Sequence, residues 1–390
     1  MQIFNLLFLI AMRLLVRYIL FIPATVLLLQ CEKEDPFVKI TDNNFLKALI
    51  GFGFDKDGDS LISYDEASLV TELYLVDVSP PIDNMDGIEA FVNLKKLHCG
   101  RNNLTSLNVS KNALLTILIC QDNFIRNLDI SNNTDLTYLN CLNNQLATLD
   151  VTNNTDLTYL NCLHNRLTTL DVSKNTLLQQ LCCTDNIITS LDISENTLLR
   201  QLSCSQNRIK SLDISKNTLL TSLDCESNIL TNLDVSNNTL LISLVCCTNQ
   251  LTDLDISKNT ALQELDCQCN EITNLNVSNN TALQRLWCTR NEITSLDVSS
   301  NNALNHFNCA NNKLTGLDVS KNTELKILIC SSNQLTMLDI SANTKLTYLF
   351  LSSMPSLYKV CVWILPFPPN GFNLDTENSP NVYFTTDCSK

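Results

Sequence analysis

The chain of 390 residues carries 26 basic and 40 acidic side chains, for a formal net charge of -14. Nucleic-acid phosphates need stripes of lysine and arginine, so this acidic balance argues against a nucleic-acid partner. Only 7 glycines are present, so another residue type must form most of the turns, and asparagine is the abundant candidate.

The N-terminal segment, residues 1–31, has the sequence of a targeting signal and is excluded from the predicted fold. Read from Met12, it has two arginines ahead of an apolar run that stops at Cys31, so we take Met12 as its start. The stretch VLLLQC resembles a bacterial lipobox, although Gln30 replaces the small residue expected there, and the following CEKEDP resembles the export signal of surface lipoproteins. The resemblance implies a lipid anchor on Cys31 and a place on the outer face of the outer membrane. An ordinary cleaved signal or a membrane helix is the alternative.

Residues 32–41 are predicted to be a linker, and residues 42–93 a helical cap around a calcium-binding loop. The stretch DKDGDSLISYDE has the spacing of an EF-hand loop, with Ser60 in place of a glycine, which makes the sharp turn more costly. Apolar residues on both sides predict two flanking helices. The expected ligands are Asp55, Asp57, Asp59, the carbonyl of Leu61, Ser63 and Glu66. We expect calcium to be structural here; a solvated acidic loop is the alternative.

From Leu94 to Lys345 the chain repeats a unit of 21 residues twelve times without a gap, each unit close to LxxLxCxxNxLxxLDVSxNTxL. A fixed period of this size predicts a solenoid in which each unit forms one coil. Both halves of the unit, LxxLxCxxN and LxxLDVSxN, alternate apolar and polar residues as a half-buried strand does. We therefore predict a right-handed parallel solenoid, mainly β, over residues 94–351, and an irregular β cap over residues 352–390.

Asparagine ends each half of the unit. Its side chain tolerates unusual turn dihedrals, and its amide can bond to backbone groups one coil away. We expect the two asparagine columns to form the turns that glycine does not provide.

A cysteine recurs at the third core position of every unit, from Cys99 to Cys330. On adjacent parallel coils the Cβ atoms lie about 4.8 Å apart, which is farther than a disulfide allows. We predict a column of free, buried and unreactive thiols, since apolar surroundings keep a thiol protonated.

Five other cysteines follow the targeting segment. Cys361 and Cys388 both lie in the C-terminal cap and are predicted to form a disulfide. Cys247 and Cys269 lie outside the cysteine column, near the turn on two successive coils, and the sequence leaves open whether they pair. Cys182 is expected to point outward from a strand without a partner.

The aspartate of LDV forms another column, from Asp129 to Asp339. Like charges at this spacing repel by roughly 1 kcal/mol in water. The column must gain either from hydrogen bonds with neighbouring Ser, Thr or backbone amides, or from cations or a basic partner.

The 21-residue repeat resembles that of leucine-rich repeat proteins, whose core motif is LxxLxLxxNxL. In particular, it resembles a bacterial class of nested 21-residue repeats with cysteine at the third core position. The resemblance implies the solenoid fold and binding of other proteins through the solvent side of the core strands.

The outward positions of the LxxLxC strand vary far more than its core positions. They include aromatic and apolar side chains of the kind that dominate interfaces. The candidate ligand-binding residues are Tyr138, Tyr159, Arg285, Trp287, His306, Ile327, Ile329, Tyr348 and Phe350. The alternative is that the C-terminal tail covers the end of this surface.

The three histidines lie far apart along the repeats, and none has a nucleophile and an orienting acid at hand. The sequence therefore predicts a non-enzymatic surface protein that binds a protein or a glycan and contacts the membrane only through its lipid anchor. A purely structural envelope or spacer protein without a specific ligand is the alternative.

Overall fold

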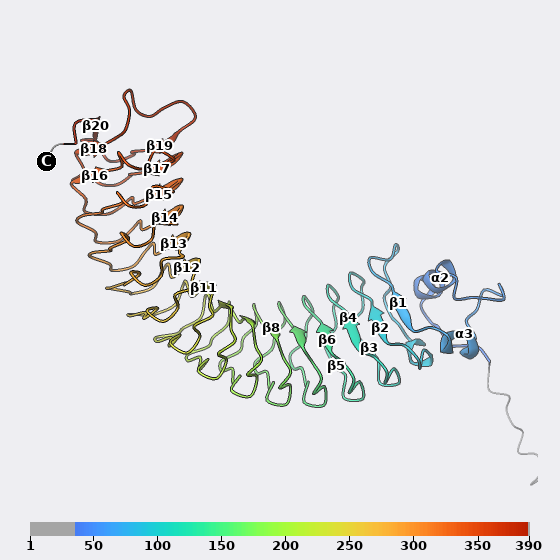
Figure 1. The fold of residues 1–390 in the computed structure, drawn as a ribbon. Helices are drawn as coiled ribbons and strands as arrows, with labels where there is room; N and C mark the ends of the chain where they lie inside the picture. Colours follow the sequence, from blue (N-terminus) through green and yellow to red (C-terminus); the bar gives the residue numbers. More distant parts are fainter. Residues whose placement is uncertain (1–35, 389–390) are drawn as a thin grey trace, which may run out of the picture.

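The computed structural model describes residues 36–388, which form one curved solenoid (Figure 1). Its strands pair in parallel with a register of 21 residues, as Tyr138 with Tyr159, and the predicted solenoid is confirmed. The predicted lipid anchor at Cys31 lies outside the described residues.

Two α-helices and a short 3-10 helix lie at the N-terminal end, and nearly all other elements are strands of two to three residues. The helices are α2 (Asn43–Gly51), α3 (Tyr64–Ser68) and η2 (Ile88–Ala90). The large sheet contains, in spatial order, β1 (Glu72–Tyr74), β2 (Lys96–His98), β4 (Ile117–Ile119), β6 (Tyr138–Asn140), β7 (Tyr159–Asn161), β8 (Gln180–Cys182), β9 (Gln201–Ser203), β10 (Ser222–Asp224), β11 (Ser243–Val245), β12 (Glu264–Asp266), β13 (Arg285–Trp287), β14 (His306–Asn308), β15 (Ile327–Ile329), β17 (Tyr348–Phe350) and β19 (Asn373–Asp375). Two small sheets contain β3 (Leu107–Asn108) with β5 (Leu128–Asp129), and β16 (Met337–Asp339) with β18 (Lys359–Cys361) and β20 (Tyr383–Thr385).

The large sheet lines the concave side of the solenoid, and the two small sheets lie on the convex side (Figure 1). The core fills the space between these sides. In one unit Leu139 and Cys141 enter it from the strand side, while Leu149 and Val151 enter it from the other half. One coil cannot hide its own leucines, so each coil depends on its neighbours for burial.

The cysteine column is buried inside this core, and all twelve of its thiols are free. Burial raises the pKa of Cys120 to about 12 and that of Cys162 well above its usual range. Cys361 and Cys388 form a disulfide in the cap.

The cysteines outside the column include three more free thiols. Cys247 and Cys269 do not pair, and the side chain of Cys182 on β8 is half-buried.

The asparagine that ends the strand half connects consecutive coils through hydrogen bonds. The Asn144 amide nitrogen donates to the carbonyls of Cys141, Leu142 and, one coil earlier, Cys120. Its amide oxygen accepts the backbone N–H of Ile125, also one coil earlier, at 3.0 Å. The bond from Ile125 gives a buried N–H group its partner, and the other three each add a second donor to a carbonyl.

The residue before that asparagine has the left-handed backbone dihedral of the turn. Our prediction that the asparagine itself would adopt it was wrong. Asn143 has a φ of 51°, and the same position is left-handed in each repeat, even where it is occupied by Thr248 or Cys269. This position lies at the loop surface, and many side chains occupy it. The asparagine contributes hydrogen bonds rather than its own backbone freedom.

The second half of most units does not form the predicted strand. In LDV, the Asp150 carboxylate accepts the backbone N–H of Thr152 at 2.9 Å and its hydroxyl at 2.6 Å. The same bond forms at Asp129 in β5 and at Asn140 in β6, so it accompanies the turn in both halves and does not by itself prevent a strand. Strand pairing on this side is limited to β3 with β5, to β16, β18 and β20, and to a bridge from Asp318 to Asp339, within the described chain.

The parallel sheet begins before the repeat motif, inside the predicted helical cap. Leu73 and Leu75 are fully buried and alternate with outward side chains, so β1 pairs with β2 although it lacks the full motif. The helix expected after the acidic loop is therefore short, ending at Ser68, whereas α2 forms before the loop as predicted.

Candidate functional site

Each strand of the large sheet sends its central residue into the core and its two flanking residues to the concave surface. On β13, Leu286 is fully buried, while Arg285 and Trp287 on either side are half-buried. Because the strands are in register, residues 21 apart in sequence form two parallel rows across this face. A ligand on the concave side would meet these rows first.

Seven of the nine predicted ligand residues meet on four adjacent strands, β13, β14, β15 and β17, and we name them the C-terminal cluster. In the register of these strands, the row that contains His306 also contains Arg285, Ile327 and Tyr348. The row that contains Asn308 also contains Trp287, Ile329 and Phe350. The cluster contains Arg285, Trp287, His306, Ile327, Ile329, Tyr348 and Phe350. Tyr348 is 41% exposed. The remaining members are half-buried, so their outer parts together form a broad apolar and aromatic surface.

The charges in this cluster are already compensated. Arg285 donates to the carboxylate of Glu264 on the neighbouring strand at 2.6 Å. Burial, with the nearby positive charges of Arg285 and Lys326, lowers the pKa of His306, so its imidazole is neutral at pH 7. The cluster therefore offers apolar contact area rather than net charge.

The C-terminal tail continues the sheet beside the cluster. Strand β19 pairs with β17, placing Asn373 next to Tyr348 and Asp375 next to Phe350. The tail's apolar residues Trp363, Phe367, Phe372 and Phe384 pack with one another in the cap. The surface of the cluster is thus extended by the tail rather than covered by it.

The other two predicted residues, Tyr138 and Tyr159, lie apart from the C-terminal cluster, because β8 to β12 separate them from it. Their rings stack with centroids 4.1 Å apart and an interplanar angle of 1°. Burial, together with the hydrogen bond to Tyr159, raises the pKa of Tyr138 to about 12. The pair forms a second, smaller aromatic surface.

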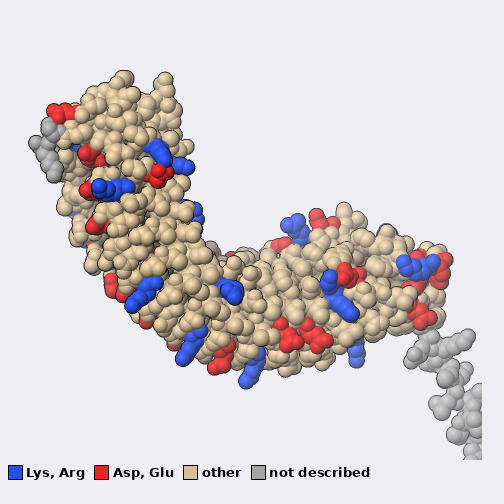
Figure 2. All heavy atoms as spheres, in the orientation of Figure 1, with Lys and Arg blue, Asp and Glu red and all other residues tan. Residues whose placement is uncertain are grey.

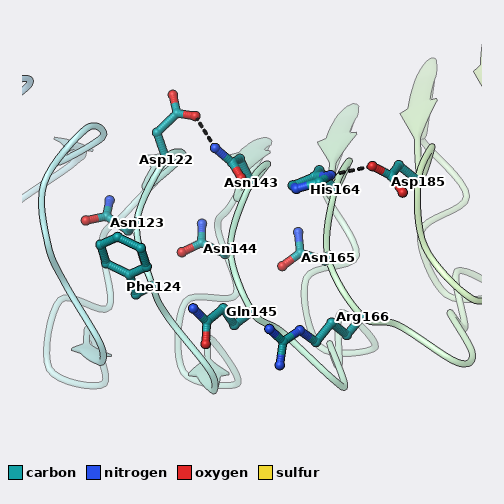
Figure 3. Close-up of a pocket in the computed structure, with 10 residues that line it drawn as sticks. All are labelled: Asp122, Asn123, Phe124, Asn143, Asn144, Gln145, His164, Asn165, Arg166 and Asp185. Atoms are coloured by element: carbon teal, nitrogen blue, oxygen red, sulfur yellow. Dashed lines mark hydrogen bonds and ion pairs between the residues drawn. The ribbon is translucent and has the colours of Figure 1, made fainter.

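A polar trough on the loop edge was not predicted from the sequence (Figure 3). Its lining comes from four successive turns after the strands, and its volume is about 380 Å³. The lining residues are Asp122, Asn123, Phe124, Asn143, Asn144, Gln145, His164, Asn165, Arg166 and Asp185. The sequence signal for this trough is the strong variation at the position two residues after the core cysteine.

The acidic loop of the N-terminal cap brings three of its predicted ligands together. Carboxylate oxygens of Asp55, Asp57 and Asp59 lie within 4.8 Å of one another. The loop is tightened by N–H groups of Gly58 and Ser60, which donate to the Asp55 carboxylate at 2.7 and 3.0 Å. Ser60 has a φ of 68°, the strained turn expected where an EF-hand has glycine.

The predicted last ligand, Glu66, lies outside this group of three. Its carboxylate accepts backbone N–H bonds from Ser63 at 2.8 Å and from Lys56 at 2.5 Å, and it caps α3. These bonds lower its pKa to about 2. The three aspartates fit a hard cation that prefers oxygen ligands, and the Leu61 carbonyl and the Ser63 hydroxyl stay predicted ligands.

The aspartate column of the convex side is held by local hydrogen bonds. At each aspartate of the column, as at Asp171 and Asp192, the carboxylate accepts the backbone N–H two residues later. Hydrogen bonds from Ser173 and Ser194 lower the pKa of these two aspartates. This favours the structural role over cation binding. Basic and acidic side chains are interspersed on the face shown in Figure 2, with wide uncharged areas between them.

The solenoid is similar to solved structures of bacterial leucine-rich repeat proteins. The functional domain of InlJ from Listeria monocytogenes, which includes a cysteine ladder, is 38% identical, with 82% of this chain and 74% of that chain covered and a TM-score of 0.77. The leucine-rich repeat protein LIC12759 of Leptospira interrogans is 26% identical over 70% of this chain and 76% of its own, with a TM-score of 0.66. The internalin InlF of Listeria monocytogenes, at 22% identity, 84% and 96% coverage and a TM-score of 0.64, shares the fold.

A solenoid with one leucine-rich unit per coil and a buried column of cysteines defines a leucine-rich repeat protein. At this identity and coverage, the chain belongs to the same family of bacterial leucine-rich repeat proteins as InlJ. No protein-family model and no curated protein sequence matches it. Neither α-helix in residues 36–388 has the length and apolar sequence that a membrane span requires.

Proposed function

We propose that the protein binds a protein partner on the concave strand face, through the C-terminal cluster and without catalysis. The observation that carries this proposal is the convergence of Trp287, Ile327, Ile329, Tyr348 and Phe350 on neighbouring strands. Large aromatic and apolar side chains at the centre of a surface supply most of the binding energy in protein interfaces. The rigid sheet holds them in place before binding, which lowers the entropic cost of association.

A spacer protein without a ligand would not need such a surface. Its outward residues could be polar, as they are along one row of the strands between the two aromatic surfaces, where Gln180, Gln201, Ser222 and Ser243 lie. The contrast between that polar stretch and the C-terminal cluster favours binding.

The test is recovery of interacting proteins from surface extracts by the mature chain. We expect Trp287→Ala and Tyr348→Ala to lose the recovered partner, because each removes a large aromatic anchor from the cluster. Met337→Ala is the matched control: Met337 is an exposed apolar side chain at the same end of the solenoid, but on the convex strand β16. Equal recovery by wild type and both cluster variants would refute the proposal.

The surface location is part of the same proposal. A lipid attached to Cys31 at the outer membrane would leave only a short linker before the cap. Metabolic labelling with a palmitate analogue tests it: label should enter the wild type and be lost in Cys31→Ser, while the control Cys182→Ser keeps it.

We also propose a structural calcium ion in the loop of Asp55, Asp57 and Asp59. The convergence of their carboxylates supports it. Calcium titration followed by calorimetry should show binding in the range of extracellular modules, about 10⁻⁴ to 10⁻³ M. Asp57→Asn should weaken binding, whereas Asp65→Asn, in the first turn of α3, should leave it unchanged. Equal binding by both variants would reject this loop as the site.

A further inference from the structure

The polar trough on the loop edge presents the same repeat positions on successive coils. One row contains Asp122, Asn143, His164 and Asp185, each 21 residues after the last. The other row contains Phe124, Gln145 and Arg166 (Figure 3). Because coils stack about 4.8 Å apart, both rows offer a contact at nearly constant intervals along the solenoid axis.

The first row is pre-organised by side-chain contacts between coils. Asn143 donates its amide to the Asp122 carboxylate at 2.8 Å, and the His164 ring bonds to the carboxylate of Asp185. Arg101 lies 3.7 Å from the Asp122 carboxylate. These contacts hold the polar side chains of the row in place, while lone pairs of the carboxylates stay available at the surface.

The second row combines an exposed ring with amide and guanidinium groups. The Phe124 side chain is 48% exposed at one end of the trough. The Gln145 side chain is oriented by Arg126, which donates to its amide oxygen at 3.3 Å, and this bond does not use the amide N–H groups of Gln145. Arg166 completes this row with an exposed guanidinium.

The chemistry of the trough argues against a peptide or a phosphate ligand. The backbone N–H groups of Asn143, Asn144 and Gln145 already donate to neighbouring coils, so no free edge is available for a peptide strand. Phe124 is the single aromatic side chain among the lining residues, so apolar anchor pockets for a peptide are missing from this trough. Two carboxylates in the first row disfavour an anionic ligand.

We propose that the trough binds a linear, uncharged oligosaccharide that runs along the solenoid axis. Sugar hydroxyls both donate and accept hydrogen bonds, so they satisfy carboxylates, amides and a guanidinium in one site. The apolar face of a pyranose ring can pack on Phe124. In an extended β-linked chain, each pyranose unit advances by nearly the same distance as one coil, so successive sugars meet equivalent positions. This site is separate from the C-terminal cluster on the strand face.

The test uses cellotetraose and chitotetraose as probes, with saturation-transfer NMR and titration of the mature chain. We expect saturation transfer to at least one tetrasaccharide and a several-fold loss of affinity in Phe124→Ala and in Asn143→Ala. The matched controls occupy the same repeat positions on coils outside the trough: Ile229→Ala for Phe124 and Asn311→Ala for Asn143. Both controls should bind as the wild type does, and thermal unfolding verifies that all four variants are folded.

A further variant separates this site from the strand face. Trp287→Ala should bind the tetrasaccharide with unchanged affinity, even where it loses its protein partner. The proposal is overturned if neither probe gives saturation transfer, if trough and control variants lose affinity equally, or if the loss follows Trp287→Ala.

Discussion

The two halves of the repeat have similar sequences but are held together differently. In the strand half, backbone ladders and an asparagine with four hydrogen bonds connect each coil to its neighbours, as at Asn144. In the other half, Asn154 makes two such bonds, to the carbonyls of Ile130 and Asn133 one coil earlier. Its buried amide oxygen has no hydrogen-bond partner.

This difference shows that a similar pattern of leucines does not produce the same backbone. Asp150 and Asn140, at corresponding places, both accept the backbone N–H two residues later, yet only Asn140 belongs to a strand, β6. Ladder bonds on the concave side and turns on the convex side make the strand half the more rigid surface. A rigid surface is the better support for a binding site.

The largest expected effect is a difference in labelling rate between the buried thiols of the cysteine column and the free thiols outside it. The thiols of the cysteine column are buried and their pKa values are raised, so at pH 8 they stay protonated and unreactive in the native protein. Among the free thiols of the described chain, Cys182 and Cys269 should react first, since both are half-buried. Mass spectrometry after timed alkylation measures this order.

A reporter thiol in the second half sharpens that experiment. In a Val172→Cys variant, the new thiol is as buried as Cys162 but lies in the half without a ladder. We expect it to be labelled several-fold faster than Cys162, because local opening needs fewer bonds to break there. Slower labelling of the reporter than of Cys162 would contradict the proposed difference in rigidity.

Removing one asparagine from each half should give unequal losses of stability. Asn144→Ala leaves the buried Ile125 N–H without its partner and takes one of two donors from each of three carbonyls, and we expect a cost of about 2 to 3 kcal/mol in the free energy of unfolding. Asn154→Ala loses two bonds but also removes an unpartnered oxygen, so about 1 kcal/mol is expected. Urea unfolding of both variants measures the difference, and equal costs would show that the columns are equivalent.

The smallest effect concerns the aspartates of the convex turns at acid pH. Hydrogen bonds from Thr152 lower the pKa of Asp150 below its unfolded value of 3.8. A group with a lowered folded pKa stabilises the protein above the unfolded pKa, and this stabilisation is lost as the pH falls below 3.8 toward the folded pKa. Unfolding midpoints should therefore drop in this range, and less so for Asp150→Ala than for wild type. An identical pH dependence in both proteins would mean that this bond does not contribute.

Much of the fold could be predicted from the repeat alone. The period of 21 and the alternation around Leu139 and Cys141 led to a parallel solenoid, and the strand spacing led to free thiols in the column. The second strand was predicted wrongly for most units, because the same alternation suits an extended turn as well as a strand, and pairing on the convex side is limited to a few coils. The early start at β1 was missed because Leu73 and Leu75 carry the alternation without the full motif.

The sequence by itself determined the coil, its period, its buried leucines and thiols, and the residues available on the strand face. Only the tertiary structure decided which of those residues act together. Residues a full repeat apart become neighbours when coils stack in register, which joins Trp287 and Phe350 on one surface and separates both from Tyr138. The same stacking brings Asp122, His164 and Asp185 to one trough at the loop edge, because identical turns place the position two residues after each core cysteine in a single line.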